Sequence, residues 1–345
     1  MKTYFNFKNG KVSYLLIIAL LLFSAGPLFA QRRLPPVRLA SLVPENTPWG
    51  AAINRMAAEW GRATNGEVQV IVFHNATAGD EPEVLRKLKL NDLQAAVFTS
   101  VGLSSVMPEV MVISYPFLIR DDAELNAVMT RLKPDLDMRI QQNGFITLAW
   151  AHAGWIRIFS KTPVYTPSDL RRLKLATGTE EEMLQAFRIM GYQMIPVNLS
   201  QVISDLNSGR IDAVYQSPIY AAGGQIFGIA KNMSGINVAP FMGGILMNNT
   251  AWRRIPERYK DELLEICKRM EREIESSIMT LENDTIATMV RFGLQINELT
   301  PQQRQEWYDD TARFENRLTG SNPPVFNRDY YNRINSILSE FRRGR

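Results

Sequence analysis

Few residues in this chain are of types that could carry out catalytic chemistry. Its 345 residues include two histidines, His74 and His152, and a single cysteine, Cys267. A zinc site takes three or four such ligands, so this set predicts no metal cluster built from cysteine and histidine. Cys267 ends the apolar helical stripe 263–267, which favours a small core residue over a nucleophile. One cysteine also excludes an internal disulfide framework.

The other motifs that could support catalysis have ordinary structural explanations. The glycine pairs at 223–224 and 243–244 lack the GxGxxG or GxxxxGKS spacing that cradles phosphate, and the sequence contains no GxSxG turn. The acidic run 180–182 favours the first turn of a helix, where the helix dipole stabilises negative charge, over an acid/base pair. The chain is therefore predicted to be no enzyme and to need no cofactor, with a periplasmic enzyme as a distant alternative.

Aromatic residues gather at predicted strand ends and in loops. Small-molecule pockets are concave sites lined mostly by apolar and aromatic side chains, often between domains. Aromatic rings also fill protein cores, and that alternative stays open for each residue. The group consists of Trp49, Tyr115, Phe117, Trp150, Trp155, Tyr215, Tyr220 and Phe241.

The amino-terminal segment is typical of export. Lysines in the first eleven residues precede an apolar run at 14–23, and small residues lead up to Ala30. This order predicts a secretory signal peptide over residues 1–30, cleaved near Ala30. There is no cysteine for lipid attachment at the cleavage point, so we expect a free periplasmic protein, with retention of the leader as an anchor left open. Without the three leader lysines the chain has 36 basic and 35 acidic residues, which does not favour a nucleic-acid partner.

Strand and helix patterns alternate through the remaining chain. Strands are predicted at 37–42, 68–73, 95–98, 145–150, 155–159, 174–177, 191–196 and 213–216, with helices between most of them. This alternation predicts an α/β fold in two lobes. We place the first lobe at 37–155 plus about 241–285, and the second at 156–240 plus about 286–345. A helix over 256–291 would exceed about 50 Å and brace both lobes, unless it divides at a kink near 283–284.

Seven motifs in order give the sequence a family resemblance over residues 37–310. They are residues 40–48, 64–70, 78–83, 107–109, 115–121, 166–175 and 198–213. Together they resemble the DctP-type substrate-binding proteins of TRAP (tripartite ATP-independent periplasmic) transporters. The resemblance implies a type II periplasmic-binding-protein-like fold, with hinge strands and the long helix joining two lobes that close over a ligand.

The resemblance also implies a carboxylate-binding arginine at two positions, and this sequence lacks both. The first falls on Ala176 and the second on Ile156, with Arg157 one residue further. Neighbouring strand residues point to opposite faces, so Arg157 replaces the missing arginine only if a bulge shifts the register. Each charge-assisted bond lost costs roughly 1.5–3 kcal/mol. We therefore expect an apolar, uncharged or amphiphilic ligand rather than a simple dicarboxylate or a sialic-acid-like one.

Motif positions supply the candidate ligand-binding residues. Glu81 is a candidate acceptor for a hydroxyl or amine, with an acid of a helix's first turn as the alternative. The full set is Trp49, Glu81, Thr99, Ser100, Trp155, Arg157, Ala176, Thr177, Gln216, Ser217 and Tyr220. No metal site is expected.

The predicted function is capture of a small molecule and its delivery to a transporter. The expected partners are the ligand and the large and small TRAP membrane subunits, with an accessory periplasmic protein as a further candidate. A periplasmic ligand sensor on the same fold is the main alternative.

Overall fold

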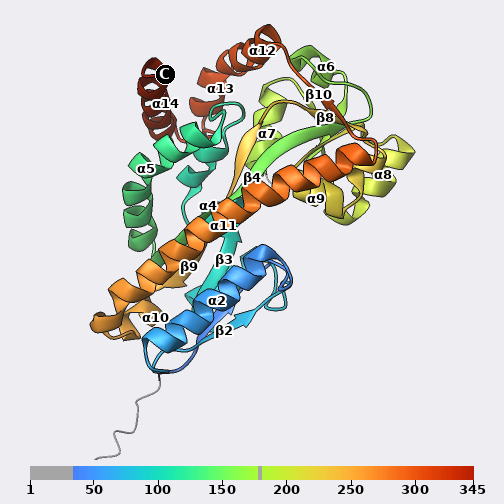
Figure 1. Ribbon diagram of the computed structural model, residues 1–345. Helices are drawn as coiled ribbons and strands as arrows, with labels where there is room; N and C mark the ends of the chain where they lie inside the picture. Colours follow the sequence, from blue (N-terminus) through green and yellow to red (C-terminus); the bar gives the residue numbers. More distant parts are fainter. Residues whose placement is uncertain (1–33, 178–180) are drawn as a thin grey trace, which may run out of the picture.

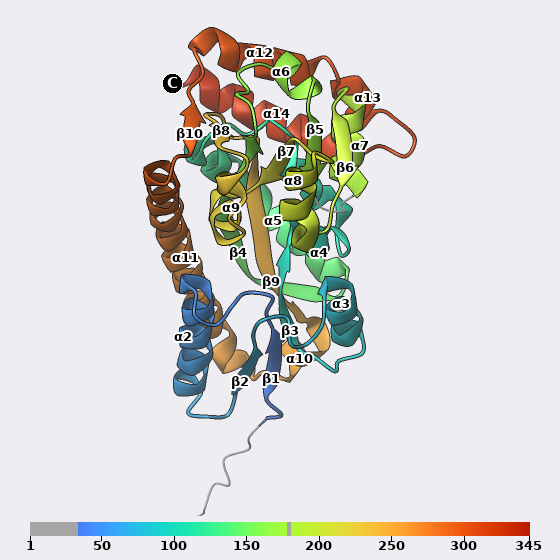
Figure 2. The ribbon, with the colours of Figure 1, turned by 90° about the vertical axis from the view of Figure 1, so that its right-hand side faces the viewer.

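The computed structural model describes residues 34–177 and 181–345, arranged as two α/β lobes connected by long strands and one long helix (Figures 1 and 2). The predicted two-lobed α/β class is confirmed. The predicted signal peptide at 1–30, its cleavage point at Ala30, and the start of the acidic run at Glu180 lie outside the described residues. Within the described residues, no helix has the length and apolarity needed to cross a membrane.

The first lobe is built on a sheet of order β2-β1-β3-β9-β4. Strands β1, β2 and β3 are parallel, and β9 joins β3 and β4 in antiparallel register. The strands are β1 Val37–Ala40, β2 Val70–Phe73, β3 Ala95–Thr99, β4 Phe145–Ser160 and β9 Ala239–Asn248. Helices α2 Pro48–Ala63, α3 Glu81–Lys89, α4 Ser100–Ser104 and α10 Asn249–Arg254 surround this sheet, with the 3-10 helix η1 Pro108–Ser114.

The second lobe continues the sheet through β4 in the order β4-β7-β5-β6. Here β5, β6 and β7 are parallel, while β7 is antiparallel to the last four residues of β4. The strands are β5 Lys174–Thr177, β6 Gln193–Pro196, β7 Ala213–Gln216, β8 Asn232–Ser234 and β10 Gln295–Asn297. Its helices are α6 Pro167–Arg171, α7 Glu181–Ile189, α8 Val202–Ser208 and α9 Pro218–Gly223, with short 3-10 helices η2 Leu199–Gln201 and η3 Ile226–Gly228.

Strand β4 is continuous, whereas the sequence predicted two separate strands at 145–150 and 155–159. Its pairing with β9 shifts register between Thr147 and Ala149 and again between His152 and Trp155. In the second shift, Gly154 adopts φ +94°, a backbone conformation that residues with a side chain rarely adopt. The bulge interrupts the alternation of side chains, so one bent strand looks in sequence like two strands.

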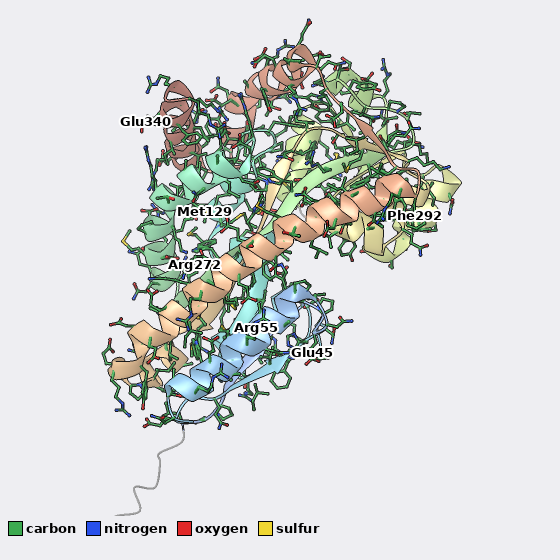
Figure 3. The ribbon with its side chains drawn as sticks, viewed as in Figure 1. Glu45, Arg55, Met129, Arg272, Phe292 and Glu340 are labelled. Atoms are coloured by element: carbon green, nitrogen blue, oxygen red, sulfur yellow. The ribbon has the colours of Figure 1, made fainter. Side chains whose placement is uncertain are left out.

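The long helix α11 Glu257–Arg291 is a single helix, so the alternative of a kink near 283–284 is not observed. It lies beside α2 and β4 of the first lobe and reaches α9 of the second (Figures 1 and 2). Arg55 of α2, labelled in Figure 3, forms an ion pair with Glu273 of α11. Buried residues from Leu263 to Met289 give the helix one apolar face along nearly its whole length.

Helix α5 Asp122–Gln142 covers the other face of β4. Its buried residues share one core cluster with Trp150 and Trp155 of β4, whereas α11 shares a second cluster with Leu148 and Ala149. The predicted carboxyl-terminal helical tail forms α12 Pro301–Ala312, α13 Glu315–Thr319 and α14 Arg328–Arg343. Of these, α14 packs on α5. The central strand β4 is therefore held between α5 and α11.

Candidate ligand-binding site

The carboxyl ends of the parallel strands of the two lobes face each other along β4. In the first lobe, β3 ends at Thr99, level with Gly243 of β9 and, across β9, with Ala151 of β4. In the second lobe, β7 ends at Gln216, opposite Arg157 of β4. Six residues of β4 separate these two levels, at most about 20 Å at 3.3 Å per residue. Ligands of α/β sheets bind outside the carboxyl ends of strands, so these two edges form the candidate site.

On the first-lobe edge, Glu81, Thr99 and Ser100 lie together. Glu81 begins α3 after the N-cap Asp80, and its carboxylate accepts hydrogen bonds from the Thr99 amide (2.6 Å) and hydroxyl (3.0 Å). The Ser100 hydroxyl donates to the carbonyl of Met242 at 2.9 Å. The start of α3 and the end of β3 are thus joined through one part-buried carboxylate that accepts two hydrogen bonds. Glu81 therefore orders this edge whether or not it also contacts a ligand.

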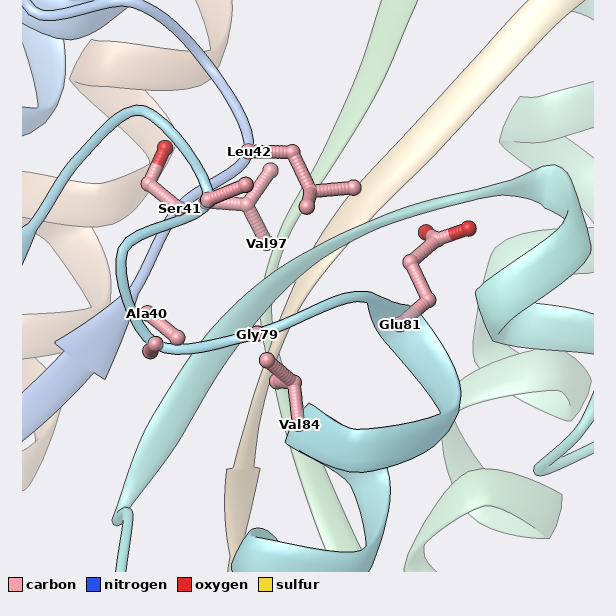
Figure 4. Close-up of a pocket in the computed structure, with 9 residues that line it drawn as sticks. Ala40, Ser41, Leu42, Gly79, Glu81, Val84 and Val97 are labelled. Atoms are coloured by element: carbon pink, nitrogen blue, oxygen red, sulfur yellow. The ribbon is translucent and has the colours of Figure 1, made fainter.

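A small pocket opens beside Glu81 at the ends of β1 and β3 (Figure 4). Its lining includes Ser41, Leu42, Gly79, Glu81 and Val97, and its empty space is about 200 Å³. This volume counts all the space between atoms, and no part of it is wide enough to hold a water molecule, so the pocket is a packing gap beside Glu81 and does not itself hold a ligand. Ser41 and Leu42 line this gap but were not predicted; their position directly after β1, at the carboxyl edge, was the signal that could have identified them.

On the second-lobe edge, Gln216, Ser217 and Tyr220 lie at the junction of β7 and α9. The Gln216 side-chain oxygen accepts the Ser217 amide at 2.8 Å, and the Ser217 hydroxyl caps α9 by accepting the Tyr220 amide at 3.3 Å. Ser217 is buried, whereas Tyr220 is 47% exposed. Tyr220 is therefore the member of this group with a side chain free to reach beyond its own lobe.

Arg157 lies on the face of β4 that is turned toward α11. Residues alternate along this part of the strand: Ile158 belongs to the core cluster of α5, and Phe159 to the cluster that contains Met289 of α11. Arg157 is on the side of Phe159, where its guanidinium donates to the Ser234 carbonyl at 3.5 Å. Burial lowers the pKa of Arg157, partly offset by the nearby negative charge of Glu282.

The remaining candidates are buried in protein contacts. Ala176 is 1% exposed within the core cluster of the second lobe, and Thr177, the last residue of β5, is 5% exposed. Trp49 packs in the core between α2 and α11. Trp155 is 5% exposed; its indole donates to Asp122 of α5 at 2.8 Å and its amide to Glu282 of α11 at 2.9 Å.

The structure therefore brings the predicted residues together in two groups, one on each facing edge, while Trp49 and Trp155 sit in the cores behind them. Their contact with a ligand stays a prediction. Among the described residues, no group of three or more histidine, cysteine or acidic side chains is placed to hold a metal ion.

Comparisons with known proteins identify relatives of this chain. A solute-binding protein of Verminephrobacter eiseniae is 31% identical over 170 residues, 49% of this chain and 51% of that protein. The chain spans about half the length of the first curated relatives that it matches, with 51%, 55% and 46% of their lengths covered.

Solved structures share the fold at low sequence identity. A TRAP periplasmic solute-binding protein of Ochrobactrum anthropi superposes with a TM-score of 0.83 at 17% identity, covering 91% of this chain and 97% of that one. One from Chromohalobacter salexigens, with bound D-glucuronate, gives 0.78 at 19% identity, covering 87% and 99%. A family model, "Bacterial extracellular solute-binding protein, family 7", matches residues 39–317. The chain belongs to this family, the DctP family of solute-binding proteins.

Proposed function

We propose that this protein captures a small organic molecule between its two lobes and delivers it to the membrane subunits of a TRAP transporter. The observation that carries the proposal is the pair of facing carboxyl edges, ending at Thr99 and Gln216, on a common strand. Each edge carries polar side chains, and a molecule that contacts both would stabilise the closed arrangement. Family membership supports the same reading.

The proposed ligand has no carboxylate that must be held by an arginine fork. Of the two positions where the family resemblance places arginine, Ala176 is a buried core residue and Ile156 is 7% exposed. Arg157 is directed toward Ser234 and Glu282 instead. An uncharged or amphiphilic molecule suits such a site, because a carboxylate left without a cationic partner there loses its hydration without replacement.

Titration calorimetry with three probes tests this ligand class. Succinate and D-glucuronate represent the carboxylates, and a neutral hexose represents an uncharged ligand of similar size. We expect no binding of either carboxylate below millimolar concentration. Micromolar binding of succinate, abolished by Arg157→Met, would contradict the proposed ligand class while leaving the binding function intact.

The proposed location is the periplasm, reached through the signal peptide at 1–30 with cleavage near Ala30. The large and small TRAP membrane subunits are the proposed partners, with an accessory periplasmic protein as a further one. Reconstitution of the two membrane subunits in liposomes tests this: uptake of the ligand should require the protein. Uptake at the same rate without it would contradict the delivery role.

A further inference from the structure

Two tryptophans of β4 make the same pair of contacts on either side of the bulge between the lobes. The Trp150 indole donates to Asp137 of α5 at 2.8 Å, and its amide donates to Glu271 of α11 at 3.3 Å. The Trp155 indole donates to Asp122 of α5 at 2.8 Å, and its amide to Glu282 of α11 at 2.9 Å. We call these sets the Trp150 clamp and the Trp155 clamp.

The distance between the two tryptophans along β4 is close to the distance between the two glutamates along α11. Trp150 pairs with Gly244 and Trp155 with Pro240 of β9, so the bulge shortens their separation to four regular strand steps, about 13 Å at 3.3 Å per residue. The eleven residues from Glu271 to Glu282 span about 16.5 Å of helix at 1.5 Å per residue, and lie about 20° apart around the helix axis. Both glutamates therefore lie on one face of α11 and reach the same strand, Glu271 at Trp150 and Glu282 at Trp155.

One acid in each clamp is disfavoured by burial. Glu282 is 6% exposed, and burial raises its pKa, opposed by the Trp155 amide and the charge of Arg157. Burial likewise raises the pKa of Asp137, opposed by the Trp150 indole. Buried acids cost stability unless hydrogen bonds satisfy them, and here the Trp155 amide and the Trp150 indole supply those bonds.

The Trp155 clamp also fixes the bulge itself. Gly154 adopts φ +94°, and a Cβ at this position would collide with the Glu282 carboxylate. The glutamate thus occupies the space left by the missing side chain and holds the next amide. Because the bulge lies between the carboxyl edges of the two lobes, its conformation sets how one lobe is oriented relative to the other.

We propose that Glu271 and Glu282 are positioning residues of the binding cycle: through the amides of Trp150 and Trp155, they couple the β4 bulge to the long helix and thereby set the open–closed equilibrium of the lobes. On each side of the bulge, α5 holds the indole and α11 holds the amide of one tryptophan. In this proposal, β4, α5 and α11 therefore move together on that side. This inference rests on the proposed function, in which the lobes close.

The test compares Glu282→Ala, Glu282→Gln and the matched control Glu265→Ala. Glu265 is an exposed glutamate of the same helix, paired with Lys268. Spin labels at Leu90→Cys and Asn207→Cys, one on each lobe, report the interlobe distance in ligand-free protein by pulsed electron paramagnetic resonance. Cys267 is buried and stays unlabelled. Hydrogen exchange of the Trp155 amide is measured on the same variants.

We expect Glu282→Ala to broaden the interlobe distance distribution and to speed exchange of the Trp155 amide about tenfold, the effect of losing one hydrogen bond. Glu282→Gln keeps a carbonyl acceptor and should restore both readouts, and Glu265→Ala should change neither. Faster exchange in Glu282→Ala with an unchanged distance distribution would overturn the proposal, because the contact would then be only local.

A second variant keeps the test decisive if Glu282→Ala does not fold. Glu271→Ala removes the acceptor of the Trp150 amide, and it should also broaden the distribution; an unchanged distribution contradicts the proposal. None of these measurements uses a ligand. A failure to find any ligand would therefore count against the proposed function, and an unaltered interlobe distance would count against the clamps.

Discussion

Gly154 and Glu282 form a contact at the centre of the molecule that can be tested by matched substitutions. Gly144 and Gly154 have nearly the same φ, +95° and +94°, but a Cβ at Gly144 meets nothing within 4 Å. Gly144→Ala should cost only the conformational strain, about 1–2 kcal/mol. Gly154→Ala should cost clearly more, because the new methyl group displaces the Glu282 carboxylate.

A double-mutant cycle measured by urea unfolding checks this prediction. In a Glu282→Ala background, the cost of Gly154→Ala should fall toward that of Gly144→Ala. An equal cost in both backgrounds would show that the glutamate and the glycine do not interact.

Arg342 is a second residue with a large expected effect. Its guanidinium makes two bonds of 2.7 Å to the carboxylate of Glu124 and one of 2.8 Å to the Leu118 carbonyl. Glu124 is 2% exposed, so Arg342→Ala leaves a buried acid without its partner. We expect a loss of about 3 kcal/mol in unfolding free energy. Arg343→Ala, at an exposed neighbour, is the control; equal losses in the two variants would contradict this account.

Sequence could identify residues at strand ends but not the contacts that they make. Of the residues chosen by motif position, Glu81, Thr99 and the pair Gln216 and Ser217 lie at three strand-to-helix junctions. The orientation of Arg157 required the register of β4, which a bulge had altered. Glu282 was not predicted to have a role, because its partner amide is 127 residues away in sequence and its own surroundings look like an ordinary helix.

At the scale of elements, the docking of α14 on α5 should depend on pH. The hydrogen bond from the Tyr330 hydroxyl holds the pKa of Asp135 below its usual value; burial opposes it, and Arg333 and Arg139 lower the pKa further. A lowered folded-state pKa means that the stabilisation is fully present above the unfolded pKa of about 3.9 and is lost as the pH falls through the folded value.

The measurement is hydrogen exchange of α14 between pH 7 and pH 3 in the wild-type protein and in Asp135→Asn. The wild-type helix should lose protection as the pH approaches 3, relative to the rest of the protein. The asparagine variant should start with less protection and change less over this range. Parallel profiles for the two proteins would show that Asp135 does not anchor α14.

The long helix and the central strand illustrate what periodicity can and cannot predict. Helix α11 was predicted to within a residue at its start, because its apolar face repeats from Leu263 to Met289 without a proline. Strand β4 was divided in two, because the bulge at Gly154 breaks the alternation on which strand prediction rests. Prediction from a single period works for a regular element and fails where a bulge, such as the one at Gly154, interrupts it.

For the whole molecule, ligand binding should shift the lobes from open to closed. Contacts from both carboxyl edges to one ligand exist only in the closed arrangement, so the ligand favours that state. At saturating ligand, we expect small-angle scattering to give a smaller radius of gyration and tryptophan fluorescence to change. If both signals stay constant while calorimetry reports binding, the two lobes do not close on the ligand.

The architecture of the whole was predictable because seven ordered motifs and a regular α/β alternation both point to it. The identity of the ligand was not predictable, because recognition depends on which side chains of the two lobes come together around it. No local sequence pattern encodes those contacts. The absence of arginine at positions 156 and 176 is the sequence feature on which the proposed ligand class rests.

Native mass spectrometry of the protein as purified from its own cells tests the central claim most directly. We predict a one-to-one complex with a single small molecule, released when the protein is unfolded and regained on incubation with a metabolite extract. The bare protein mass under both conditions, before and after incubation, would contradict the account of this chain as a solute-binding protein.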